Sequence, residues 1–115
     1  MHVVDTILSQ TAEVFRRTPD ELVGRSRRRQ IVEARQAAMW AIRQRYPSLS
    51  LETIGTALGG RHYTTVMHAL DAVEERARQN DVYRVQLQRL IARISSSSRL
   101  ARPLNRGESS RRADR

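Results

Sequence analysis

The segment "GGRHYTTVMHA" at residues 59–69 contains the residue types of a recognition surface. Two glycines come first, then an arginine, a histidine, a tyrosine and two threonines, and apolar residues recur at helical spacing after them. These polar side chains can donate or accept hydrogen bonds, and glycine permits a tight turn. The segment therefore predicts a turn that presents a polar helix N-terminus to a partner.

The residue types that catalysis or metal binding requires do not come together in the sequence. The chain has no cysteine, and His62 and His68 do not share a ligand spacing with each other or with carboxylates. Glu33, Glu74 and Glu75 have the pattern of solvated helix faces. The chain also has no lysine, which excludes a phosphate-binding loop that ends in Gly-Lys-Ser/Thr. We expect no enzymatic activity, no metal and no cofactor.

The charge predicts a polyanionic partner. All 21 basic residues are arginine, against 12 acidic residues, which gives a net charge of +9. Arginine binds phosphate through a planar fork, so nucleic acid is a better candidate than a membrane surface or an acidic protein. The chain has neither a long apolar run nor a signal-peptide pattern, and no heptad seam. We expect a cytoplasmic, nucleoid-associated protein that contacts no membrane, with a monomer favoured.

Apolar periodicity predicts an all-α fold of about six helices and no strand. Thr18 and Ser50 are expected helix caps, and "RSRRR" at 25–29 is expected to be an exposed basic loop. The expected helices are 3–17, a short one starting at Pro19, 30–45, 51–58, 63–79 and 82–95. We expect one domain at 1–95 and a disordered Arg/Ser-rich tail at 96–115 that carries +4 of the net charge.

The two helices around the glycines have the lengths and turn of a helix-turn-helix of the Trp repressor-like type. Ile54 and Leu58 of the first helix are expected to face Val66 and Leu70 of the second. The N-terminal residues of the second helix would then project outward. Together with the basic loop one helix upstream, this arrangement favours binding of double-stranded DNA.

The stretches "GRSRRRQIVEARQAAMWAIRQ" and "SLSLETIGTALGGRHYTTVMHAL" resemble the C-terminal DNA-binding domain (domain IV) of the bacterial chromosomal replication initiator DnaA. The resemblance extends over residues 3–95. It implies a minor-groove role for Arg27 in the basic loop and major-groove contacts for the helix 63–79. The DNA-binding residues that it implies, with their neighbours in the loop and the turn, are Arg27, Arg28, Arg29, Arg35, Gln36, Arg43, Arg61, His62, Tyr63, Thr64, Thr65 and His68.

The chain departs from this family where the family has Asp-His and the chain has His62-Tyr63. An aspartate accepts from cytosine N4 and caps a helix well, whereas we expect His62 to be a poor cap. Tyr63 either packs as a hydrophobic staple at the start of the helix or contacts a base. The family's recognition sequence is therefore not assumed for this chain.

The resemblance implies a stand-alone double-stranded DNA-binding protein without the initiator's ATPase, which modulates replication initiation or transcription. The alternative is a protein-interaction module that binds DnaA or its regulatory proteins, with DNA binding weak or lost because of His62-Tyr63. The substitutions Arg27→Ala and Thr65→Ala separate the two hypotheses, because only the first needs these side chains for its activity.

Overall fold

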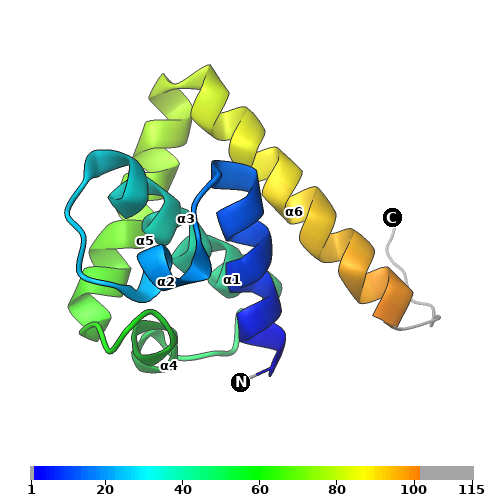
Figure 1. Cartoon of the computed structure of the whole chain (residues 1–115), viewed down its shortest axis with the longest axis horizontal. Helices are drawn as coiled ribbons and strands as arrows, with labels where there is room; N and C mark the ends of the chain where they lie inside the picture. The colour runs from blue at the N-terminus through cyan, green and yellow to red at the C-terminus, as the bar shows by residue number, and fades with distance from the viewer. Residues whose placement is uncertain (1, 102–115) are drawn as a thin grey trace.

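A computed structural model of the chain describes residues 2–101, with side chains from residue 3 to residue 96. Six α-helices and no strand occur in this stretch, which confirms the all-α prediction. The helices are α1 (His2–Phe15), α2 (Pro19–Val23), α3 (Arg29–Arg45), α4 (Leu51–Ala57), α5 (Tyr63–Gln79) and α6 (Asp81–Ala101). In Figure 1, α6 runs diagonally beside α1, and α4 lies at the opposite end of α5 from the α5–α6 junction.

Helix α3 lies at the centre of the fold and packs against each of the other helices. Its alanines at 34, 37, 38 and 41 have no exposed surface, and small side chains of this kind let neighbouring helices approach closely. Ile31 and Ile42 of the same helix are buried as well. Larger side chains from the surrounding helices, among them Leu22 and Leu90, complete the core.

Helices α4 and α5 form the predicted helix-turn-helix. Ile54 and Leu58 are fully buried together with Val66, in the same core cluster. Gly59 and Gly60 have φ angles of 87° and 78°, in the left-handed region that favours glycine. These two residues reverse the chain between the helices, so that α5 starts at the surface.

The helix starts follow the expected capping chemistry. Thr18 and Glu21 form a reciprocal capping box at the start of α2, and Pro19 occupies its first helical position. Ser50 caps α4 by accepting from the amide of Thr53 at 3.0 Å. These caps explain why the beginnings of both short helices could be predicted from the sequence.

The expected end of the last helix at residue 95 is wrong, because α6 continues to Ala101. Serine lowers helix propensity only slightly, and no glycine or proline interrupts the segment before Pro103. The remainder of the expected tail, 102–115, lies outside the described residues, and the domain boundary at 95 stays a prediction.

Candidate nucleic-acid interface

His62 caps the N-terminus of α5, so the expectation of a poor cap is wrong. Its backbone is extended, and its Nδ1 accepts a hydrogen bond from the amide of Thr64 at 3.2 Å. A ring nitrogen thus replaces the side-chain oxygen that usually fills this role. Because Nδ1 acts as an acceptor, the neutral ring carries its proton on Nε2 and can donate a hydrogen bond from there.

Tyr63 lies on the surface against His62 and does not act as a packed staple. The two rings are stacked, with centroids 4.6 Å apart and planes 29° apart. Tyr63 is 43% exposed, and both rings belong to the exposed surface at the start of α5. Stacking restricts the His62 ring and therefore also the direction of its free nitrogen.

The outer face of α5 repeats every three residues. His62, Thr65 and His68 are exposed, whereas Val66 and Ala69 are buried against the core. Thr64 is half-buried beside the cap, and its Oγ1 lies 2.8 Å from the Nδ1 of His62. His68 thus faces outward and does not fill the helix packing.

The basic loop, expected at 25–29, comprises residues 24–28 in the structure and connects α2 to α3, because Arg29 already belongs to α3. Arg25, Arg27 and Arg28 are exposed in it, as expected, and Arg28 forms no side-chain cap on α3. Arg29 begins α3, where it pairs with Glu33 at 3.1 Å. Arg27 and Arg28 are therefore the two predicted DNA-binding residues of this loop that keep their guanidinium groups available to a partner.

Arg61 attaches the basic loop to the turn of the helix-turn-helix. Its guanidinium donates to the carbonyl oxygens of Val23, Gly24 and Leu58. Gly59 allows this close approach, because a Cβ there would lie 2.2 Å from the oxygen of Val23. Residues nearly forty positions apart in the sequence thereby form one continuous surface, and Figure 1 shows the loop leaving α2 near this turn.

Arg35 lies inside the fold, although the resemblance predicts a contact with DNA. Its side chain is 5% exposed. Its three nitrogens donate to the carbonyl oxygens of Leu22 at 2.7 Å, of Ser26 at 3.1 Å and of Glu21 at 3.1 Å. In this structure the guanidinium holds α2 and the basic loop onto α3.

Two further residues predicted to bind DNA are half-buried. Arg43 is half-buried and donates to the carbonyl oxygen of Leu49 at 2.7 Å, which fixes the connection between α3 and α4. Gln36 is half-buried, and its Oε1 is enclosed without a hydrogen-bond partner among the described residues. Neither side chain lies fully on the surface that carries Thr65 and Arg27.

Three arginines converge where the loop meets the turn. Burial lowers the pKa of Arg35, and the charges of Arg61 and Arg25 lower it further. Burial and the charge of Arg25 also lower the pKa of Arg61. Such a concentration of positive charge is relieved by a bound anion. Arg25 was not among the residues predicted to bind DNA, and the structure brings its charge close to Arg35 and Arg61.

Residues 2–101 contain neither a cluster of metal ligands nor a helix that could span a membrane. Within residues 2–101, no three His, Cys, Asp or Glu side chains lie together as metal ligands. None of the helices in that stretch has the length and apolar character needed to cross a membrane. The best-defined candidate site is therefore the surface formed by the basic loop and the start of α5.

Comparison with known proteins confirms the resemblance. The family model described as the bacterial DnaA protein helix-turn-helix matches residues 4–73. The chromosomal replication initiator protein DnaA of Corynebacterium jeikeium (strain K411) is 41% identical over 98 residues, which cover 85% of this chain and 16% of that protein. DnaA of Thermomicrobium roseum is 42% identical over 90 residues, which cover 78% of this chain and 19% of that protein.

DnaA of Gloeobacter violaceus is a third relative, 38% identical over 96 residues, which cover 83% of this chain and 21% of that protein. The chain thus spans about a fifth of the length of these curated relatives. The family match includes both the basic loop and the helix-turn-helix. The chain belongs to the bacterial DnaA helix-turn-helix family.

Proposed function

We propose that the chain binds double-stranded DNA, with the first turns of α5 in the major groove and the basic loop in an adjacent minor groove. The observation that carries this proposal is the attachment of the loop to the turn by Arg61. Because of this link, the side chains of both segments meet a duplex as one preformed surface. An α-helix fits the major groove, and arginine is favoured in a narrow minor groove.

The exposed side chains have two proposed roles, which are to contact bases and to bind phosphates. Thr65 offers a methyl group to thymine and a hydroxyl group to a base or phosphate. Arg27 is the proposed minor-groove residue, and Arg25 and Arg28 neutralise phosphates. The first turn of α5 has no acidic residue, so the positive end of the helix dipole favours phosphate there.

His62 is proposed to change the base preference of the family. Where an aspartate accepts a hydrogen bond from cytosine N4, the Nε2–H of His62 donates one. Acceptors in the major groove are guanine N7 and O6, adenine N7 and thymine O4. The base pair that residue 62 faces is therefore expected to present one of these acceptors in place of the cytosine amine.

Binding of this kind suits a protein that occupies sites related to those of DnaA and thereby modulates replication initiation or transcription. Charge substitutions test the DNA-binding proposal. Arg27→Ala is expected to weaken binding to a duplex about tenfold or more, as measured by fluorescence anisotropy.

Arg78→Ala is the matched control for this experiment. Arg78 is exposed near the far end of α5, where it pairs with Glu75. Its substitution is expected to leave duplex affinity within about twofold, since it lies almost four helical turns from Thr64. Equal losses in the two variants would show that net charge alone drives binding and would refute the proposed surface.

A further inference from the structure

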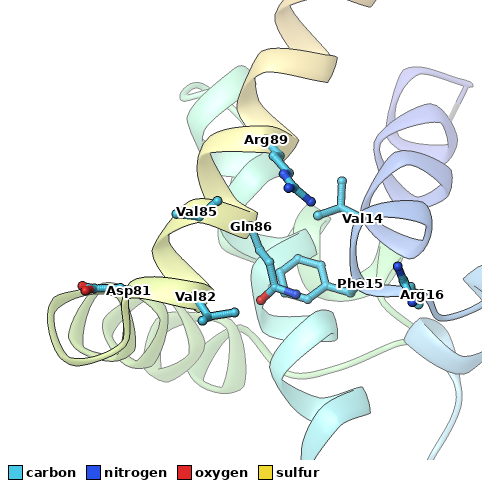
Figure 2. Close-up of a pocket in the computed structure, with 8 residues that line it drawn as sticks. All are labelled: Val14, Phe15, Arg16, Asp81, Val82, Val85, Gln86 and Arg89. Carbon is cyan, nitrogen blue, oxygen red and sulfur yellow. The ribbon is translucent and has the colours of Figure 1, made fainter.

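A groove lies between the C-terminal end of α1 and the first turns of α6, outside the proposed DNA-binding surface (Figure 2). Its volume is about 460 Å³, and apolar side chains from both helices line it: Val14, Phe15, Val82 and Val85. Val82 is 70% exposed and Val85 is 45% exposed. These two valines are three residues apart and therefore share one face of α6, which has no cover among the described residues.

The rim of the groove is basic. Arg16 and Arg89 line it from opposite sides, and Figure 2 shows Arg89 extending from α6 toward Val14. Neither arginine forms an ion pair within residues 2–101. Asp81, the acidic residue of the lining, is already paired with Arg84. The groove thus combines exposed apolar surface with two positive charges that lack acidic partners.

The backbone of Arg16 is a second, independent observation at this groove. Its φ angle is 58°, and within residues 2–101 no other non-glycine residue has a positive φ. Arg16 closes α1, where glycine is the usual residue because a side chain is disfavoured in left-handed backbone. The chain therefore places a guanidinium at this rim despite a conformational cost.

We propose that this groove binds an amphipathic helical segment of a protein partner, with apolar side chains facing Val82 and Val85 and Asp or Glu residues facing Arg16 and Arg89. The apolar lining does not suit a phosphate backbone, which prefers polar donors. A second copy of the chain is disfavoured because each copy carries +9. Carboxylates on the partner would form charge-assisted hydrogen bonds with both arginines.

The position of the groove permits a partner and DNA to bind together. Asp81 and Val82 follow the C-terminal end of α5, whereas the proposed reading residues are at its N-terminal end. The 17 residues of α5 separate these ends by roughly 24 Å. The groove could thus recruit an acidic partner to the DNA site without blocking the site.

Titration of the isotope-labelled full chain with synthetic peptides, followed by NMR, tests the proposal. One peptide is an amphipathic helix with leucines along one face and glutamates beside them, and the second has lysines in place of the glutamates. The glutamate peptide is expected to bind at least about tenfold more tightly, because only its charges complement the rim. The amide shifts should concentrate around Phe15, Val82 and Val85.

Two valine variants sharpen the test. Val82→Ser is expected to weaken binding of the glutamate peptide about fivefold, since apolar contact is lost. Val3→Ser is the matched control, because Val3 is 41% exposed on α1 outside the groove. This variant is expected to bind the glutamate peptide with unchanged affinity. Both variants should bind duplex DNA like the unmodified chain, which shows that they are folded.

Several results would overturn the proposal. One is equal binding of the two peptides, or binding of neither. A second is a set of amide shifts centred on α4 and the start of α5. Self-association that Val82→Ser abolishes would assign the groove to a second copy of the chain, and shifts at Val82 on adding duplex DNA would assign it to DNA.

Discussion

The substitution Arg35→Met tests whether this arginine stabilises the fold or binds DNA. Methionine keeps much of the length and volume of the side chain but cannot donate a hydrogen bond. The substitution leaves the carbonyl oxygens of Leu22, Glu21 and Ser26 without the donors that they have in the structure. The C-terminal part of the short helix α2 and the basic loop then lose this attachment to α3.

The expected loss can be worked from these contacts. A net contribution of about 1 kcal/mol for each hydrogen bond gives a loss of about 3 kcal/mol in the free energy of unfolding. Bonds to a charged donor are stronger than this, but burial and the charges of Arg61 and Arg25 disfavour the guanidinium and offset part of the gain. Urea denaturation followed by circular dichroism measures this loss.

The DNA assay gives the opposite expectation for the same variant. If Arg35 bound a phosphate directly, its removal would reduce the magnitude of the negative slope of log K against log salt by about 0.9. We expect the slope to stay unchanged in the folded variant. Arg28→Met is the matched control, because Arg28 is exposed in the basic loop and should lower the slope without affecting stability. Unchanged stability with a reduced slope in Arg35→Met would show instead that Arg35 binds a DNA phosphate and does not hold the fold.

Three further predictions concern the glycine turn, the cap at His62 and the buried residue Tyr83. In urea denaturation, Gly59→Ala is expected to lower the free energy of unfolding by at least about 2 kcal/mol, because the new Cβ would collide with Val23. Gly60→Ala is expected to lower it by only about 1 kcal/mol, because Gly60 has a similar φ but its Cβ would meet open space. His62→Asp is expected to shift the preferred base toward cytosine in a binding selection with randomised duplexes, and an unchanged preference would exclude residue 62 from base reading. Burial raises the pKa of the Tyr83 hydroxyl above its ordinary value of 10.0. The stability that comes from this shift is fully present below pH 10.0 and is lost as the pH rises through the folded-state pKa. Tyr83→Phe should therefore lose less stability than the unmodified chain between roughly pH 9 and pH 11, and parallel curves would contradict this origin.

The helices could be predicted from the sequence because local signals define them. Thr18 with Glu21, Ser50, and the paired glycines mark boundaries through chemistry that acts within a few residues. The end of α6 was missed because a serine run weakens a helix without stopping it. The cap at His62 was missed because histidine is rarely used in this role, and only the ring position reveals the acceptor.

The roles of the arginines could not be predicted from the sequence. Arg27 and Arg35 have the same side chain, and the resemblance predicted a DNA contact for both. Only the fold shows that Arg35 donates to three carbonyl oxygens, whereas Arg27 is exposed and donates to none. Arg61 has the same ambiguity, since its link to Gly24 joins segments far apart along the chain. Which guanidinium serves the fold depends on tertiary contacts and not on local pattern.

The most direct test of the account is anisotropy of labelled duplexes with the full chain at low and at high salt. The duplexes would carry the DnaA recognition sequence, the same sequence with each base pair replaced in turn, and a scrambled sequence. At least one related duplex is expected to bind more tightly than the scrambled one, with an affinity that falls by about 0.9 log units per log unit of salt for each phosphate contacted. Absence of binding to every duplex, or affinity that does not change with salt, would contradict DNA recognition by the basic loop and α5.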